Sequence, residues 1–281
     1  MSRDATPIRI EEFIEFYESV HGRPPFSWQS DLAAQVCDSG WPDLIDLPTA
    51  SGKTAVIDIA IFALAQSAGR WRSMERQERP PRRIFFTVDR RLIVNQAFLH
   101  GHKMARKLWH AVESSDGNAS PVLQRVARAL QSINGGGEHP VPLDCFELRG
   151  GIPRDDAWVR SPTQPTLITT TVDQIGSRML FRGYVVSNRN RPIHAALTTH
   201  DALILLDEAH CSIPFGQTIA SIDRYRGDAW SPEPIDSPFR FVPMTATPSP
   251  SSEHTNVFRL TDSHYEESEA LRTRVQLPPP P

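Results

Sequence analysis

One stretch decides the fold: Leu47-Pro48-Thr49-Ala50-Ser51-Gly52-Lys53-Thr54, which follows a short apolar run and precedes a helical pattern. A loop that holds a triphosphate needs backbone N–H groups at a helix N-terminus, a lysine for the β and γ oxygens and a hydroxyl for Mg²⁺. Gly52 permits close approach of the backbone, Lys53 supplies the ammonium group and Thr54 supplies the hydroxyl. We therefore predict a site for ATP and Mg²⁺, with a loop completed by Pro48, Thr49, Ala50 and Ser51.

The loop departs from the general pattern GxxxxGK[ST], because Leu47 stands where the first glycine is expected. The alternative is a Ser-Gly-Lys-Thr turn that caps an ordinary helix.

A second motif, Asp207-Glu208-Ala209-His210, directly follows the apolar run 202–206 and argues against that alternative. At a strand end Asp207 can hold Mg²⁺, and Glu208 can orient and deprotonate an attacking water. A helix start with acidic residues near its dipole would explain the acids but not their pairing with the loop. The candidate catalytic groups are Lys53, Asp207 and Glu208.

Two weaker motifs accompany this pair, Thr245-Ala246-Thr247-Pro248 and Phe26-Ser27-Trp28-Gln29. Small hydroxyls at a strand end can hydrogen-bond to the acidic motif, so we assign a coupling role to His210, Thr245 and Thr247. The Gln29 amide can donate to and accept from the adenine edge together, which would select adenine over guanine. Taken alone, the first motif is typical of a turn and Gln29 of a helix surface.

Apolar runs alternate with helical patterns along the chain, which predicts an α/β fold with a mostly parallel sheet covered by helices on both faces. Strands are expected at 44–47, 84–88, 143–148, 167–171, 202–206 and 239–244. Helices are expected at 9–20, 27–37, 53–68, 91–109, 121–132, 172–182 and 215–226. Ligands of such folds bind at the carboxyl ends of the strands, where the motifs fall.

The bulk composition excludes several classes of protein. With 281 residues, 39% of them hydrophobic and a formal net charge of −3, the chain can bury a large core and is not a polycation, so any nucleic-acid contact must come from a local patch. The three cysteines show no CxxC spacing, so we expect neither a disulfide framework nor a zinc ribbon. Without an apolar leader or a membrane-length apolar run, we expect a soluble, cytoplasmic protein.

In this order, the four motifs resemble the first RecA-like domain of a superfamily 2 helicase. The match narrows to the helicase–nuclease of type I CRISPR systems, in the subtype once called U and now G. It covers roughly residues 24–260 and rests on the segments Thr87–Ala97, Leu148–Gly151, Thr171–Arg178 and Arg191–Ala195.

The resemblance implies an ATP hydrolase that moves 3′-to-5′ along single-stranded DNA, after recruitment to an R-loop opened by a crRNA-guided effector complex. It places a set of strand-end residues along the DNA: Arg91, Arg149, Gly150, Thr171, Gln174 and Arg178. Donors in such loops suit contact with phosphates rather than reading of bases. The alternative for each arginine is a solvated surface charge.

The family also has a second RecA-like domain, which supplies arginine fingers, and a nuclease domain built around a His-Asp metal pair. We expect a helical extension at 1–23, a RecA-like ATP-binding domain at 24–262, and a proline-ended tail or the start of an inter-domain linker at 263–281. We interpret the chain as a fragment, a truncated gene product or one subunit of a split motor, which alone binds ATP weakly and hydrolyses it slowly. His200-Asp201 is interpreted as a strand-edge turn, and His100-Gly101-His102 as a helix surface.

Three alternatives stay open. The chain could be a translocase lobe from a restriction or RNA-remodelling system, a choice that depends on residues 87–97 and 171–195. It could be a stand-alone lobe that binds a nucleotide or partner without turnover, although the intact loop and acidic motif disfavour this. A small-molecule kinase with a phosphate loop would leave the Thr-Ala-Thr-Pro motif unexplained.

Overall fold

The structure is a computed structural model that describes residues 7–113, 120–135, 140–151, 156–230, 232–246 and 255–276. Its centre is a seven-stranded sheet in the order β3-β4-β2-β5-β6-β1-β7, and every neighbouring pair is parallel. The strands are β1 (Leu44–Asp46), β2 (Arg83–Val88), β3 (Asp144–Leu148), β4 (Thr166–Thr171), β5 (Ala202–Leu206), β6 (Phe239–Thr245) and β7 (Val257–Arg259). The predicted α/β class, with a parallel sheet between helices, is confirmed. Six strands were predicted and β7 was not.

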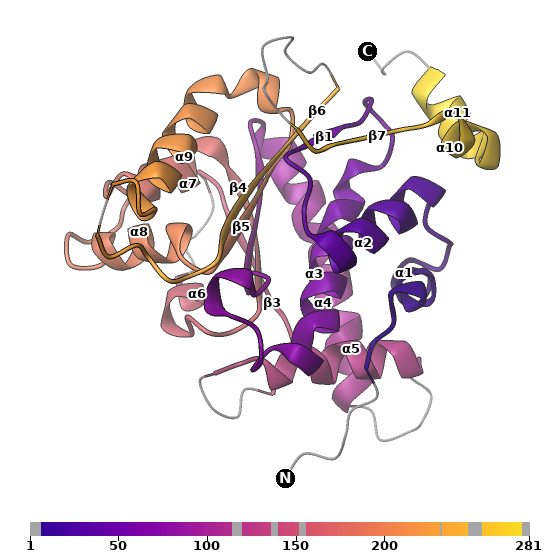
Figure 1. Ribbon diagram of the computed structural model, residues 1–281, viewed down its shortest axis with the longest axis horizontal. Coiled ribbons are helices and arrows are strands. Elements are labelled where there is room, and N and C mark those ends of the chain that lie inside the picture. Colours follow the sequence, from indigo (N-terminus) through magenta and orange to yellow (C-terminus); the bar gives the residue numbers. More distant parts are fainter. Residues whose placement is uncertain are drawn as a thin grey trace.

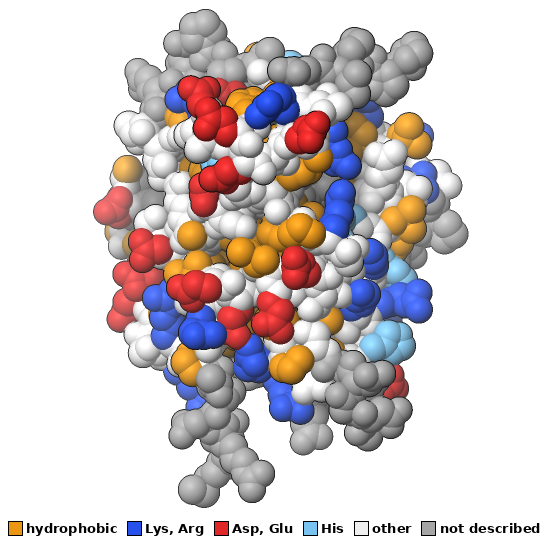
Figure 2. Space-filling model, turned by 90° about the vertical axis from the view of Figure 1, so that its right-hand side faces the viewer, with side chains coloured by type: hydrophobic (Ala, Val, Ile, Leu, Met, Phe, Trp, Pro, Cys, Tyr) orange, Lys and Arg blue, Asp and Glu red, His pale blue; other side chains and the backbone are white. Residues whose placement is uncertain are grey.

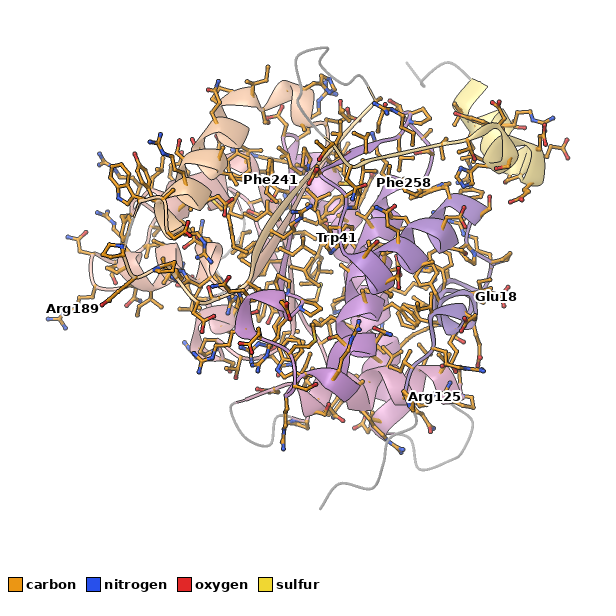
Figure 3. All side chains as sticks on the ribbon, in the orientation of Figure 1. Glu18, Trp41, Arg125, Arg189, Phe241 and Phe258 are labelled. Carbon is orange, nitrogen blue, oxygen red and sulfur yellow. The ribbon has the colours of Figure 1, made fainter. Side chains whose placement is uncertain are left out.

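Helices cover both faces of the sheet (Figure 1). One layer contains α1 (Phe13–His21), α2 (Ser27–Ser39), α3 (Val56–Gln66), α4 (Arg91–Glu113) and α5 (Pro121–Ser132). The other contains α6 (Ala157–Arg160), α7 (Val172–Met179), α8 (Arg191–Thr199) and α9 (Ile213–Arg226). Two short helices, α10 (Asp262–Glu267) and α11 (Glu269–Gln276), follow β7 beside α2. The outer edges of the two layers are marked by Glu18 on α1 and Arg189 before α8 (Figure 3).

Each face of the sheet packs into its own hydrophobic core. Along β2, Ile84 and Phe86 belong to the core under α3, α4 and α5, whereas Phe85 between them belongs to the core under α7 and α9. Because successive strand side chains point to opposite faces, a strand with helices on both sides buries every residue. All residues of β2 and β5 are buried; β5 is apolar throughout, whereas β2 also buries the polar residues Arg83 and Thr87.

The N-terminal helix packs into the same core as the sheet. Phe13 and Phe16 of α1 are buried, and their rings lie 5.4 and 5.5 Å from the ring of Phe62 on α3. Arg125 of α5 makes an ion pair with Glu12, just before α1 (Figure 3). Residues 8–20, expected as an extension, therefore share the hydrophobic core of the sheet and its helices.

Several local predictions differ from the structure. Helix α2, expected at 27–37, has Phe26 as its N-cap and continues to Ser39. The segment predicted as a tail or linker contains α10 and α11, where Leu271 is fully buried and His264 Nε2 lies 2.9 Å from Asp31 Oδ2. These helices have few apolar residues, so hydrophobic periodicity could not reveal them.

The surface carries charges of both signs. On the face toward which α1, α2 and α10 lie, acidic and basic side chains occur together with apolar ones (Figure 2). This mixture agrees with the small net charge of −3. Among the described residues, no helix is long and apolar enough to cross a membrane.

Candidate nucleotide and nucleic-acid sites

The predicted phosphate loop joins β1 to a short 3-10 helix, Lys53–Ala55, which continues into α3. Gly52 has a φ of +88°, in the left-handed region that favours glycine. Ala50 has a φ of +64°, an uncommon conformation for alanine that marks the crown of the loop as strained. The loop is anchored by the buried Ser51, whose Oγ donates to the Pro48 carbonyl at 2.8 Å and whose own carbonyl accepts from Trp28 Nε1 at 3.2 Å. Ala50 is exposed, so the crown is open to a ligand.

The lysine of the loop reaches the acidic motif. Lys53 Nζ lies 3.0 Å from Glu208 Oε1 and 3.7 Å from Asp207 Oδ1, and only 8% of the lysine is exposed. The strands that carry these residues, β1 and β5, are separated by β6, so about 10 Å lies between their axes. The long lysine side chain spans that gap. The structure thus brings Lys53 together with two adjacent residues that are more than 150 positions away in the sequence.

Burial sets the electrostatics of the acidic motif. Burial raises the pKa of Asp207, the charge of Glu208 raises it further, and the nearby Lys53 ammonium offsets only part of this effect. The Glu208 backbone N–H donates to Asp207 Oδ1 at 3.0 Å. Glu208 itself has a φ of +51°, a strained conformation that occurs preferentially at functional sites. A desolvated carboxylate beside a strained one is a suitable place for a multivalent cation.

The acidic motif is linked to the end of β6. His210 Nδ1 lies 3.1 Å from Thr245 Oγ1 and 3.4 Å from Glu208 Oε2. Thr245 is buried, and it occupies the position between the strands of Lys53 and Glu208. Two of the three predicted coupling residues are therefore in contact, whereas Thr247 lies outside the described residues. Thr54, predicted to bind the metal, follows Lys53 and is partly buried.

Gln29 supports the loop in this structure. Its side chain is 1% exposed; its Oε1 accepts from the Phe26 backbone N–H at 2.9 Å and its Nε2 donates to the Gly52 carbonyl at 3.4 Å. A Cβ at Gly52 would lie 3.2 Å from Gln29 Nε2, so the two residues are in close contact. The amide thus fixes the glycine of the loop, and adenine selection by Gln29 stays a prediction.

All six predicted nucleic-acid residues line one hollow of about 490 Å³ at the carboxyl ends of β2, β3 and β4. Arg91 is exposed, and its guanidinium lies so close to Gly150 that a Cβ there would be 3.1 Å from Arg91 Nη2. Arg149 Nε pairs with Glu147 Oε1 at 2.6 Å. Thr171 is largely buried at the end of β4. The hollow is open and has arginines along its wall.

One of the six residues is not a surface donor. Arg178 is 2% exposed, and its Nη1 donates to the carbonyl and to Oε1 of Gln174, each at 2.8 Å. Both residues belong to α7, and they are in contact because residues four apart share a helix face. In this structure Arg178 holds Gln174, and a contact of Arg178 with nucleic acid stays a prediction.

An apolar turn beside the hollow was not predicted. Helix α7 ends at Met179 instead of continuing to 182, and the turn that follows exposes four large side chains, Leu180, Phe181, Tyr184 and Val185. Tyr184 and Val185 line the hollow. Phe181 and Val185 have φ values of +58° and +60°, and the backbone N–H groups of residues 182 and 183 hold the turn by donating to the Ser177 carbonyl. The sequence signal for this turn was Gly183, which interrupts a run of large apolar residues directly after the helix.

The two His-containing motifs differ in outcome. Asp201 accepts from the Arg82 backbone N–H at 2.8 Å and from Arg82 Nε at 2.7 Å, and His200 Nδ1 lies 2.9 Å from the Ala196 carbonyl, in agreement with a strand-edge turn. The interpretation of His100 as a helix-surface residue is wrong, because its Nε2 lies 2.5 Å from Oδ2 of the buried Asp58. Its neighbour His102 is exposed.

No protein-family model matches the sequence, and no curated protein matches it. Among solved structures, the chain is similar to a crystal structure described as the DUF1998 helicase MrfA bound to DNA, with 14% sequence identity and a TM-score of 0.43. The match covers 86% of this chain and 28% of that one, so the chain spans less than a third of that helicase. We draw no functional conclusion from this degree of likeness.

Proposed function

We propose that this chain is the ATP-binding lobe of a superfamily 2 helicase-type motor. The observation that carries the proposal is the convergence of Lys53 Nζ on Glu208 and Asp207 beside a strained loop at the start of a helix. An ammonium, two carboxylates and a helix N-terminus at strand ends are the groups that phosphoryl transfer from a nucleoside triphosphate requires.

Each residue has a defined task in this proposal. Lys53 exchanges its carboxylate partners for the β and γ oxygens of ATP, while the backbone N–H groups of the loop hold the phosphates. Asp207 and the Thr54 hydroxyl hold Mg²⁺, which neutralises charge on the phosphates. Glu208, once released from Lys53, orients a water and accepts its proton. His210 transmits the position of Glu208 to Thr245 through the contacts at 3.4 and 3.1 Å.

Nucleotide binding tests the assignment of Lys53. We expect Lys53→Ala to weaken binding of a fluorescent ATP analogue with Mg²⁺ by at least tenfold, because a charge-assisted contact to phosphate is lost. Lys103→Ala, which removes an exposed lysine from α4, is the matched control and should bind as the wild type does. Equal affinities for the two variants would overturn the assignment.

We further propose that single-stranded nucleic acid lies in the hollow beside α7. The support is the placement of Arg91 and Arg149 on its wall, with the exposed Tyr184 at its rim. The arginines suit phosphates, and an aromatic ring can stack on an unpaired base. Arg91→Ala should lower affinity for a labelled DNA strand and reduce its salt dependence by about one counterion.

Two further variants separate the contributions to this surface. Tyr184→Ala should weaken binding without changing the salt dependence, because stacking releases no counterions. Arg189→Ala removes an arginine at the outer edge of the molecule (Figure 3) and serves as the control. If fluorescence anisotropy showed the same loss for Arg189→Ala as for Arg91→Ala, the hollow would not be the binding site.

On the sequence resemblance alone, we propose that the motor acts in type I CRISPR interference. In that context DNA-stimulated turnover needs a second RecA-like lobe, whose arginine fingers are worth about 10³ to 10⁵ in rate in related hydrolases. The chain alone is then expected to hydrolyse ATP slowly with or without DNA. Robust DNA-stimulated hydrolysis by the isolated chain, or absence of recruitment to an R-loop bound by a crRNA-guided complex, would contradict this proposal.

A further inference from the structure

Three ionisable side chains from three helices meet near the start of α3, the helix that follows the phosphate loop. His21 is the last residue of α1, Asp58 lies in the first turn of α3, and His100 lies in the middle of α4. The Asp58 side chain is fully buried, His21 is 8% exposed and His100 is 21% exposed. None of the three takes part in the nucleotide or nucleic-acid site described above.

The two imidazoles share the carboxylate of Asp58. His21 Nε2 lies 2.8 Å from Oδ1, and His100 Nε2 lies 2.5 Å from Oδ2. The imidazole rings are stacked, with centroids 4.7 Å apart and planes inclined by 23°. One ligand atom from each residue can be chosen so that all three lie within 4.8 Å of one another. Two nitrogens and one carboxylate oxygen therefore lie close together.

We propose that His21, Asp58 and His100 form a binding site for one divalent transition-metal ion of the zinc type. Zinc takes imidazole nitrogen at about 2.0–2.1 Å and carboxylate oxygen at about 2.0–2.2 Å in tetrahedral geometry. Two imidazoles on one tetrahedral ion then have centroids about 5 Å apart, close to the observed 4.7 Å. Mg²⁺ and Ca²⁺ prefer oxygen ligands throughout, so a site with two imidazoles excludes them as the preferred ions.

The electrostatics of the site favour a cation. A carboxylate that is withdrawn from water needs an opposite charge as well as hydrogen bonds. Either protonated imidazoles or a divalent ion can supply that charge, and the ion does so while both imidazoles stay neutral and act as ligands. The partial exposure of His100 leaves a route by which the ion and a water, as fourth ligand, can enter.

The position of the site gives it a structural consequence. Asp58 follows Lys53 by five residues on the continuous helical segment that begins at the phosphate loop. A metal bridge would tie the N-terminal helix α1 and the long helix α4 to the base of that segment. We infer that the bound ion stabilises the helical layer that positions the loop, without contact with ATP.

Metal binding by the purified full chain tests the proposal. After treatment with a chelator, the protein is titrated with Zn²⁺ in competition with a chromophoric chelator, and with Co²⁺ while visible absorption is recorded. We expect one equivalent of Zn²⁺ per chain, an intense tetrahedral Co²⁺ spectrum and a higher melting temperature with Zn²⁺, because an ion that binds only the folded state stabilises it. His100→Ala should lose at least about tenfold in affinity, the loss seen even when only an outer partner of a metal ligand is removed.

Two variants keep the test decisive. His102→Ala removes the exposed histidine of the same helix and should retain the site. His100→Gln can still donate a hydrogen bond to Asp58, so a merely structural histidine would be replaced without consequence, whereas a metal ligand would lose the tetrahedral Co²⁺ spectrum. Equal Zn²⁺ affinity of wild type and His100→Gln, or an octahedral Co²⁺ spectrum in the wild type, would overturn the proposal. ATP-analogue binding, followed in parallel, reports on the nucleotide site separately.

Discussion

The two ends of the same parallel sheet treat buried charge differently. At the amino end, Arg83 donates to the carbonyls of residues 197, 200 and 201 at 3.0, 3.0 and 3.4 Å and to that of Pro162 at 2.6 Å. Arg226 likewise donates to the carbonyls of Thr199 and Ser237. At the carboxyl end, Lys53 pairs with the Glu208 and Asp207 side chains.

The difference separates structural charge from functional charge. Backbone carbonyls are fixed by the fold, so a guanidinium that they hold cannot change partners. Burial lowers the pKa of Arg83 to about 10, which still leaves it charged at neutral pH. Side-chain carboxylates can be exchanged for phosphate or metal, so the carboxyl end keeps its charges available to ligands. Substitutions at the carboxyl end should therefore lower activity without lowering stability. Substitutions at the amino end should lower stability without lowering ligand affinity.

The largest effect is expected at the carboxyl end, on hydrolysis. Glu208→Gln keeps the shape of the side chain but removes the base, so the rate of ATP hydrolysis in the assembled motor should fall by about 10² to 10⁴. The melting temperature should be retained, and ATP binding should be at least as tight as in the wild type. Steady-state phosphate release and binding of the fluorescent analogue check both parts, and unchanged turnover would show that Glu208 is not the base.

The next effect is expected at the amino end, on stability. Arg83→Met fills similar volume but leaves carbonyls without donors, which should lower the free energy of unfolding by about 3 kcal/mol. Urea denaturation measures this change. Where the protein remains folded, affinity for the ATP analogue should equal that of the wild type. A loss of affinity without loss of stability would break the distinction between the two ends.

The smallest effect concerns the buried acid of the nucleotide site. Because the pKa of Asp207 is raised by burial, its contribution to stability is full below the ordinary pKa of aspartate and is lost as pH rises through the raised value. Asp207→Asn removes the cost of burying an ionised carboxylate, and Lys53 retains Glu208 as partner. The variant should melt a few degrees above the wild type at pH 7, and the difference should shrink as pH falls. Calorimetry across pH that shows a constant difference would contradict this account.

Six of the seven strands, and the proximity of Lys53 to the acidic motif, could be predicted from the sequence, because the strands and the motifs at their ends are encoded locally. Strand β5 is a continuous apolar run, and the acidic motif follows it directly. Strand β7 was missed because it has three residues, and it is placed by pairing with β1, where Val257 lies opposite Leu44. Helices α10 and α11 likewise depend on contacts such as His264 with Asp31.

The contacts of individual side chains were less accessible to sequence reasoning. His100 was assigned to the surface, since its partner Asp58 lies on another helix and the periodicity of α4 does not reveal it. For Arg178, spacing within α7 permitted either a contact with a strand of nucleic acid or the internal bond with Gln174 that the structure shows. Such choices depend on the tertiary structure around each residue.

The salt bridge between Lys53 and Glu208 couples the affinity for ATP to the availability of the proposed base. In the proposed motor, ATP binding must separate this 3.0 Å pair, so the free energy of separation lowers the affinity for ATP. The same separation leaves the Glu208 carboxylate free to act as the base. An empty lobe is thus protected from idle proton transfer, and a variant that lacks the carboxylate should hold ATP more tightly than the wild type even though it cannot consume it.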